Sequence, residues 1–525
     1  MKVIYIENSN FRFNVLLNDD KWTLVNMGNE RIYYYKPIIQ LKEEKYQKRI
    51  GLPLIKINKK KNYLYIYSGS ISYAEIFYRI DGDIITISDG VNSMHKSDDI
   101  VLNDKLLEML CFKYTLGNET AIKDIYYLQS GEELILLDGV FSVTEKYYYN
   151  NDGIELDDSI ETLYDISIEL YNGYRGELKN KTIIVPLSGG LDSRLIASML
   201  KTCNYENVIC LCYGVRENWE SKISKKVANA LDYEWIFVEY DETTYIDKMD
   251  DTLKFIKNHN YYHTPCIQEL PSTRSIYSSL CERDEDFVFL PGHTGDFLSG
   301  GHIPTNIRQI DSLNDIKKYI LSKHITSYLY YPIEKIENLI YKYIQKIPYY
   351  NEPYKLIEYY DWKERQSKFI IKACRAYEFY NCKWITPLWS KPYLDYFSNI
   401  SLNSKLNKKK YKTFLYDAVF NQYGLSFDKD DKSKTILHDG LYNLTRNKVK
   451  KILKKMSIYK YINKKPYYKN ACGFDRSFPL LYESYFENRN DVLLSHLKDD
   501  LKLYNKTNDI NVYESEIIVD MILNS

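Results

Sequence analysis

The stretch that decides the fold is TIIVPLSGGLDSRLIASML, residues 182–200. It opens with apolar, mostly β-branched residues up to Leu187, which is typical of a strand buried on both faces. The turn SGG at 188–190 follows, and from Leu191 onward apolar residues recur at helical spacing. The stretch therefore predicts a buried strand, a tight glycine turn and a helix in direct succession.

This turn has the chemistry of a phosphate-binding loop. A turn between a strand and a helix N-terminus presents unpaired backbone N–H groups, and its glycines let the backbone approach an anion closely. Ser188 and Ser193 add hydroxyl donors, and Asp192 in the first helical turn can hold Mg²⁺ against phosphate oxygens. The pattern indicates a pyrophosphate-binding loop that differs from Walker A, because the Gly-Lys-Ser/Thr ending is missing.

Length and composition exclude several classes of protein. The chain has 525 residues, enough for about two to three domains. Lys plus Arg and Asp plus Glu both number 71, so the charge balance gives no reason to expect nucleic acid as a partner. Nine cysteines without a Cys-x-x-Cys pair favour a reducing cytoplasm over a zinc or disulfide scaffold. We also expect neither a signal peptide nor a membrane span.

The chain divides into two regions of different pattern. Residues 1–150 are β-rich, with strands expected at 62–67 and 82–87, a helix at 105–114 and a hairpin from 132–137 and 140–147. The polar residues 150–158 read as a linker. From about 159 helices alternate with apolar strands, expected at 182–187, 207–214, 235–238 and 286–290. This alternation predicts an α/β parallel sheet whose ligands sit beyond the carboxyl ends of the strands.

A second loop follows the last of these strands. Residues 291–296, PGHTGD, again deliver glycines and one carboxylate at the end of an apolar run. Asp192 and Asp296 would then face each other across nucleotide phosphates and share Mg²⁺. The alternative is that Asp296 only caps the helix that follows, a position for which Asp is well suited.

The last third of the chain is helical and charged. Residues 446–465 are basic, with apolar residues on one face. This segment either touches an anionic membrane or polyanionic substrate, or docks its apolar stripe on the protein itself, which is the commoner outcome.

Together these motifs are similar to those of the asparagine synthetase group of amidotransferases, whose synthetase half is a PP-loop ATP pyrophosphatase. The similarity lies in SGGLDS at 188–193, in GHTGD at 292–296 with Gly300-Gly301 beyond, in Lys434 six residues before Gly440, and more weakly in 387–389. The resemblance implies a degenerate class II glutamine amidotransferase-like domain of Ntn-hydrolase type at 1–150, with strands at 73–78 and 84–89. It implies an asparagine synthetase-like ATP pyrophosphatase domain at 159–525.

The resemblance also implies the chemistry. A carboxylate would attack the α-phosphorus of ATP to give an acyl-adenylate and pyrophosphate, and an amine would then displace AMP. The residues expected to bind ATP and its pyrophosphate are Leu187, Ser188, Gly189, Gly190, Asp192, Ser193, Leu211 and Gly292. Asp192 and Asp296 would hold Mg²⁺. Lys434 would steady the α-phosphate or the tetrahedral intermediate, with Lys432 as a competitor for this role.

Two positions depart from the family pattern. Lys2 stands where active members carry the glutaminase cysteine, so we expect nitrogen from ammonia or an amine instead. His293 stands where asparagine synthetases have glutamate, and it either acts as a general base or serves as a hydrogen-bonding loop residue. The carboxylate substrate is then aspartate, a sugar acid or a peptide side chain.

Two other functions remain open at this point. A nucleotide-binding pseudoenzyme within a biosynthetic assembly would account for the lost cysteine, although the intact loop residues argue against it. A PP-loop tRNA-modifying enzyme would usually bring paired cysteines or a basic appendage, for which only 446–465 qualifies. The expected partners are ATP, a carboxylate, ammonia or an amine, and, as one possible partner, a second copy of the chain.

Overall fold

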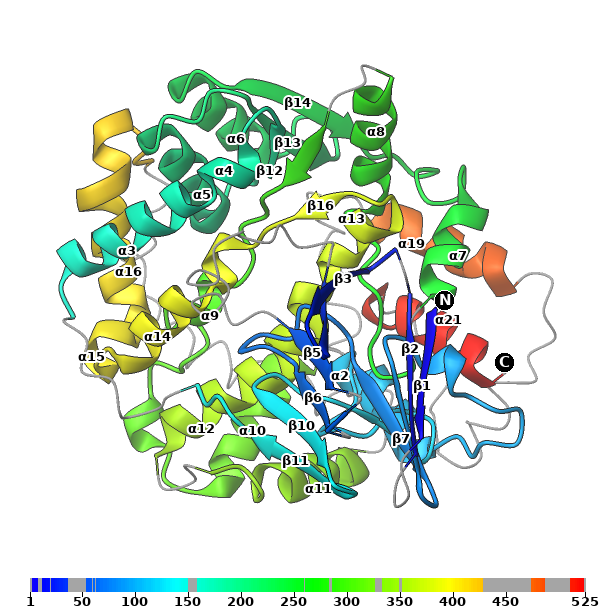
Figure 1. The fold of residues 1–525 in the computed structure, drawn as a ribbon. Helices are drawn as coiled ribbons and strands as arrows, with labels where there is room; N and C mark the ends of the chain where they lie inside the picture. Colours follow the sequence, from blue (N-terminus) through cyan, green and yellow to red (C-terminus); the bar gives the residue numbers. More distant parts are fainter. Residues whose placement is uncertain are drawn as a thin grey trace, which may run out of the picture.

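The computed structural model describes most of the chain. The described ranges are 2–7, 12–18, 20–35, 53–58, 60–61, 63–149, 158–258, 260–282, 286–325, 333–348, 352–427, 474–486 and 510–523. The predicted linker, apart from Asp158, lies outside these ranges, as do the basic segment 446–465 and both Lys432 and Lys434. Figure 1 shows a β-rich N-terminal part, in blue and cyan, beside a parallel sheet in green.

The first 149 residues are β-rich, as their pattern predicts, and their strands form two sheets. One has the order β1-β2-β8-β7-β9 and the other β11-β10-β6-β5-β4-β3. The strands are β1 (Lys2–Glu7), β2 (Arg12–Leu17), β3 (Trp22–Met27), β4 (Glu30–Tyr35), β5 (Leu54–Asn58), β6 (Tyr63–Tyr67), β7 (Phe77–Asp81), β8 (Ile84–Ser88), β9 (Ile125–Tyr127), β10 (Glu132–Leu137) and β11 (Val140–Glu145). The hairpin β10–β11 is confirmed, with Leu137 opposite Val140. The helix predicted at 105–114 is α2 (Asn103–Phe112).

One predicted strand in this region is wrong in extent. The segment expected at 73–78 becomes a strand only from Phe77. Residues before it are held by side-chain contacts instead of ladder hydrogen bonds. Tyr73 packs edge-on against Trp384, with ring centroids 5.4 Å apart, and its hydroxyl donates to the Trp389 carbonyl at 2.9 Å. Tertiary contacts with the second half of the chain therefore override the local β pattern.

The second part is built on a five-stranded parallel sheet with the order β14-β13-β12-β15-β16. Its strands are β12 (Thr182–Pro186), β13 (Val208–Gly214), β14 (Glu234–Glu239), β15 (Phe287–Phe289) and β16 (Lys383–Trp384). Helices α5 (Leu191–Thr202) and α6 (Trp219–Ala230) lie on one side and α8 (Leu270–Cys281) on the other (Figure 1). The predicted α/β fold and its four apolar strands are confirmed, and β16 is a further, short strand.

The strand order sets the position of the site. β12 pairs with β13 on one side and with β15 on the other, so the order reverses direction at β12. Ligands of open parallel sheets bind outside the carboxyl ends of the strands at such a switch point. The loops that follow β12 and β15 both start at this edge.

Helices make up most of the remaining described chain. They are α3 (Ile160–Gly173), α4 (Arg175–Leu178), α7 (Met249–Lys257), α9 (Gly295–Leu298), α10 (Leu313–His324), α11 (Ile333–Ile344), α12 (Pro353–Tyr360), α13 (Arg375–Phe379), α14 (Lys391–Asn399), α15 (Leu402–Lys405), α16 (Lys409–Thr413), α19 (Phe474–Phe486) and α21 (Ile510–Leu523), with π-helices at Asp361–Ile370 and Phe414–Phe420. Among these described helices, none has the length and apolar character needed to cross a membrane.

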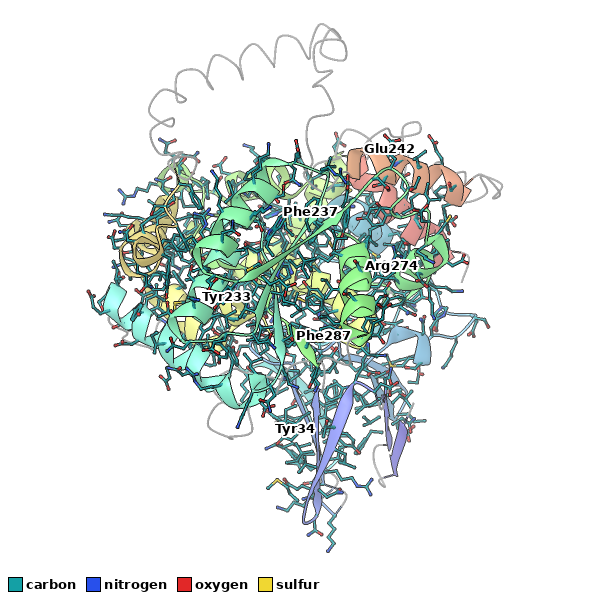
Figure 2. The ribbon with its side chains drawn as sticks, turned by 90° about the horizontal axis from the view of Figure 1, so that it is seen from above. Tyr34, Tyr233, Phe237, Glu242, Arg274 and Phe287 are labelled. Atoms are coloured by element: carbon teal, nitrogen blue, oxygen red, sulfur yellow. The ribbon has the colours of Figure 1, made fainter. Side chains whose placement is uncertain are left out.

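The two parts meet along a buried polar seam. Figure 2, the view from above, shows Tyr34 of the N-terminal strands to one side of the sheet that carries Phe237 and Phe287. At the seam the buried Glu75 carboxylate accepts a hydrogen bond from the Tyr262 hydroxyl at 3.0 Å and lies 3.3 Å from Arg375. Burial alone would raise the pKa of Glu75, but Arg375, with His263 and Lys372, lowers it well below its ordinary value.

We predict that Glu75→Ala destabilises the protein by about 3–5 kcal/mol, because it leaves buried cations without their carboxylate. The free energy of unfolding in guanidinium chloride measures this loss. The matched control is Glu133→Ala, which removes a half-buried carboxylate paired at 2.8 Å with the exposed Lys146. That change should cost less than about 1 kcal/mol. Equal losses for the two variants would contradict the prediction.

Candidate functional site

The loop after β12 is braced by its own side chains. The Ser193 hydroxyl accepts the Ser188 N–H at 3.1 Å and lies 3.1 Å from the Ser188 hydroxyl, which in turn accepts the Gly190 N–H at 3.1 Å. Behind the loop, the buried Arg194 donates to the Gly189 carbonyl at 3.2 Å. These bonds give a compact turn whose hydroxyls and N–H groups sit at the N-terminus of α5, where an anion is favoured.

The loop after β15 packs directly on the first loop through its glycines. A Cβ on Gly292 would lie 2.6 Å from the Ser193 nitrogen, and a Cβ on Gly295 would collide with the Asp192 carboxyl group. Neither position has room for a side chain, so these contacts require glycine. Between them, Thr294 adopts a left-handed conformation with φ of 83° at the start of α9. The predicted meeting of the two loops at one sheet edge is therefore observed.

Asp192 is the more perturbed of the two loop carboxylates. It accepts hydrogen bonds from the Tyr411 hydroxyl at 2.8 Å and from the Asp296 backbone N–H. Burial and the like charge of Asp296 raise the pKa of Asp192 to about 6, although Lys408 and the hydrogen bonds oppose this. A carboxylate in this state is poised to take a cation.

Asp296 is exposed, with 65% of its side chain accessible, and it pairs with Lys408. Burial would raise the pKa of Asp296, but the Lys408 ammonium outweighs burial and lowers it. Gly301 makes room for this lysine, and Gly300 makes room for Lys405 of the same segment. A Cβ on Gly301 would lie 2.6 Å from the Lys408 Cε, and one on Gly300, whose φ is +80°, would lie 2.7 Å from the Lys405 carbonyl.

The donor set fits Mg²⁺. Asp192 and Asp296 supply two neighbouring carboxylates, and the described residues contain no cluster of three or more metal-ligating side chains. Mg²⁺ is commonly held by one or two carboxylates and completes its octahedron with water and phosphate oxygens, so two carboxylates suffice. The raised pKa of Asp192 indicates uncompensated negative charge at the position where a cation would bind.

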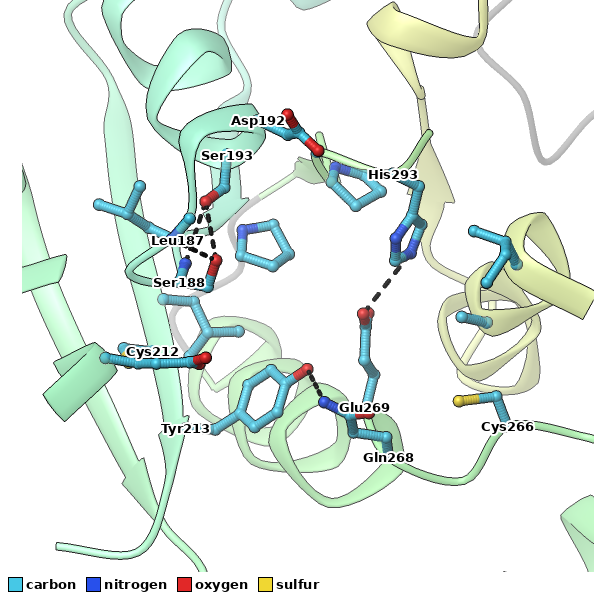
Figure 3. A pocket seen from close by; sticks show the side chains of 18 of the residues that line it. Leu187, Ser188, Asp192, Ser193, Cys212, Tyr213, Cys266, Gln268, Glu269 and His293 are labelled. Carbon is cyan, nitrogen blue, oxygen red and sulfur yellow. Dashed lines mark hydrogen bonds and ion pairs between the residues drawn. The ribbon is translucent and has the colours of Figure 1, made fainter. Parts of the chain in front are cut away.

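The two loops border a cavity of about 380 Å³ (Figure 3). Most of the predicted site residues line it, namely Leu187, Ser188, Gly190, Asp192, Ser193, Leu211, Gly292 and His293. Gly189 and Asp296 lie beside it: a Cβ on Gly189 would meet Trp219 at 2.9 Å, and Asp296 contacts Asp192. Lys434 lies outside the described residues.

Across the cavity from the phosphate loop lie the side chains of His293 and Glu269. Glu269 belongs to none of the sequence motifs. His293 Nε2 lies 3.5 Å from Glu269 Oε1, and a dashed line in Figure 3 marks this pair. Glu269 is 6% exposed and accepts a hydrogen bond from the Tyr377 hydroxyl. Burial raises the pKa of Glu269, while His293 and Tyr377 act to lower it. Tyr377 is itself fixed by stacking on Phe289 of β15, with ring centroids 4.2 Å apart.

Sequence reasoning missed Glu269, Tyr377, Lys408 and Tyr411. Glu269 precedes an ordinary helix, and Lys408 lies in a run of three lysines, so neither stands out. A local signal was available only for Lys408, because the Gly300-Gly301 pair predicts a close approach by another segment. It does not identify which segment approaches.

Comparison with known proteins agrees with this geometry. Residues 180–422 match the family model described as asparagine synthase, and this match supports ATP-dependent amidation in general. No curated protein matches the chain. Among solved structures 32 chains match. One is an NH3-dependent NAD synthetase from Campylobacter jejuni subsp. jejuni NCTC 11168 in complex with the nitrate ion, 16% identical over 28% of this chain and 61% of that chain, with a TM-score of 0.19.

We predict that Gly292→Ala weakens binding of Mg²⁺ and a non-hydrolysable ATP analogue by at least about tenfold. The added methyl group would collide with the Ser193 nitrogen and push the two loops apart. Isothermal titration calorimetry measures the affinity. Gly176→Ala is the matched control, since a Cβ there meets nothing within 4 Å. An unchanged affinity in Gly292→Ala would contradict the close contact.

Asp192→Asn should stabilise the protein while abolishing nucleotide binding. Because the pKa of Asp192 is about 6 in the folded protein and lower in the unfolded chain, folding favours its protonated form and stability falls as pH rises through that interval. The neutral amide removes this penalty, roughly 1–3 kcal/mol above pH 6. The free energy of unfolding, measured at about pH 7.5, should be larger for Asp192→Asn than for the wild type. At about pH 4.5 this difference should largely vanish. A lower free energy of unfolding for Asp192→Asn at the higher pH would contradict the raised pKa of Asp192.

Proposed function

We propose that the protein forms an amide bond at the expense of ATP, through an acyl-adenylate, with release of AMP and pyrophosphate. The observation that carries this proposal is the contact between the SGGLDS loop and the second loop, which brings Asp192 beside Asp296 at the edge of a nucleotide-sized cavity. The asparagine synthase family match over 180–422 supports the same reaction class.

In the first step a carboxylate attacks the α-phosphorus of ATP and pyrophosphate leaves. The hydroxyls of Ser188 and Ser193, now bonded to each other, would turn to the departing phosphates together with the N–H groups of the turn. Leu187, directly after β12, and Leu211, in the middle of the neighbouring β13, would receive the adenine. Asp192 and Asp296 would hold Mg²⁺, which supplies charge neutralisation for pyrophosphate.

In the second step an amine attacks the acyl carbon and AMP leaves. His293 lines the cavity, and its Nε2 makes no hydrogen bond to any described residue, so it is available to take a proton from the amine. Lys434, by analogy with the family, would steady the α-phosphate. The carboxylate is aspartate, a sugar acid or a peptide side chain.

We further propose that residues 1–150 are a degenerate glutaminase domain and that 159–525 are the synthetase domain. The single cysteine in the first 150 residues is Cys111. It is 4% exposed, and burial raises the pKa of its thiol well above the ordinary value. A buried thiol of this kind is a poor nucleophile, which supports ammonia or a free amine as the nitrogen source.

Exchange of labelled pyrophosphate into ATP, with a panel of carboxylates, tests the first step. The wild type should exchange with at least one acid, and Asp296→Asn should lower the rate by at least about tenfold. Glu239→Gln is the matched control, because Glu239 ends β14 at the same sheet edge without lining the cavity. Tight nucleotide binding with no exchange for any acid would instead favour a pseudoenzyme, and no nucleotide binding would refute the proposal.

A further inference from the structure

The cavity has two ends of different chemistry. One side carries the phosphate loop, and across the cavity from it Glu269 faces His293 (Figure 3); the lining also includes Gln268, Phe369, Ile370 and Ala373. Among the described residues that line the cavity there is no lysine or arginine. Its ionisable carboxyl groups are Asp192, Glu220 and Glu269. A cationic group of a ligand would therefore be attracted to the described cavity wall.

Glu269 is a buried carboxylate with incomplete compensation. One of its oxygens accepts the Tyr377 hydroxyl, and the other faces His293 Nε2 at 3.5 Å, beyond ordinary hydrogen-bond length. Burial of an ionised carboxylate costs free energy unless a cation or several donors satisfy it. Glu269 is 6% exposed and lies on the wall of a cavity. A carboxylate in this position can serve as the counter-ion of a positively charged ligand.

The spacing of Glu269 and His293 matches one kind of ligand group. A nitrogen that lies about 3 Å from both Glu269 Oε1 and His293 Nε2 would close a triangle over their 3.5 Å separation. An ammonium group has several N–H donors, so one can point at the carboxylate and another at the imidazole. His293 Nε2 has no hydrogen-bond partner among the described residues.

The cavity lining also has apolar side chains from the segment that precedes Tyr377, the hydrogen-bond donor to Glu269. Phe369 and Ile370 end the π-helix Asp361–Ile370, and Ala373 follows one turn later. All three line the cavity, and Phe369 and Ile370 are half-buried. A substituent placed against them gains by apolar contact, whereas a charged substituent would lose solvation without finding a cationic side chain in the described lining.

We infer that this end of the cavity binds the amine substrate in its ammonium form, with Glu269 as counter-ion, and that the amine carries an uncharged, apolar substituent. The inference rests on the proposed amide-forming function. The ammonium gives one proton to His293, and its freed lone pair forms the C–N bond with the acyl carbon. The bond from that carbon to the AMP oxygen breaks with its electron pair on AMP, and a second proton leaves the nitrogen for water.

Calorimetric titration of the full chain, loaded with Mg²⁺ and a non-hydrolysable ATP analogue, tests this inference. The probes are isopentylamine and β-alanine, which have similar shapes but end in methyl groups and a carboxylate respectively, together with ammonium chloride. Isopentylamine should bind at least about tenfold more tightly than the other two. Glu269→Gln should weaken isopentylamine by about tenfold or more while nucleotide affinity is retained.

Glu220→Gln is the matched control, because Glu220 lines the same cavity but lies beside Gly189 at the phosphate end. It should keep isopentylamine affinity within about twofold. Glu269→Asp preserves the charge and should bind isopentylamine more tightly than Glu269→Gln, which separates charge from folding effects. Equal affinity for β-alanine or ammonium, or unchanged binding in Glu269→Gln, overturns the inference. Loss of nucleotide binding in the wild type would refute the proposed function itself.

Discussion

The site depends on one steric constraint, the close approach of two loop backbones that only glycine permits. Gly292 lies against the Ser193 backbone and Gly295 against the Asp192 carboxyl. Because the loops touch, the Asp296 N–H reaches Asp192 and the two carboxylates repel each other, which contributes to the raised pKa of Asp192. The raised pKa of Asp192 therefore follows from packing. A residue larger than glycine at 292 or 295 would move the Asp192 and Asp296 carboxylates apart and weaken their repulsion.

The groups that stabilise the Asp192 and Asp296 carboxylates come from far along the chain. Lys408 reaches Asp296 over Gly301, and its segment is anchored by the neighbouring Lys405, whose buried ammonium pairs with Glu358 at 2.7 Å. Tyr411 from the next helix donates to Asp192. One short stretch, 405–411, thus acts on both loop carboxylates, so a shift of this stretch would change the affinity of both for a cation together.

Much of this arrangement follows from local sequence pattern. The run at 182–187 and the repeat that starts at Leu191 are strong signals, because a doubly buried strand must be apolar and a helix must alternate faces every turn. Strand ends at a common edge then bring Asp192 and Asp296 together. Glu269, Tyr377 and Lys408 carry no such signal. Their partners are 24, 108 and 112 residues away in sequence, and only tertiary packing selects them among many similar residues.

The charge distribution also constrains the order of events in the proposed reaction. Acidic groups occupy both ends of the described cavity wall, so ATP would be repelled unless Mg²⁺ accompanied it, whereas an ammonium ion would be attracted even to the free protein. His293 faces Glu269 and belongs to the same loop as Asp296, so this loop contributes to both sides of the cavity. A cation held at Asp296 would therefore fix the loop that carries the base. Activation of the carboxylate and capture of the amine are then linked through a single short segment, 291–296.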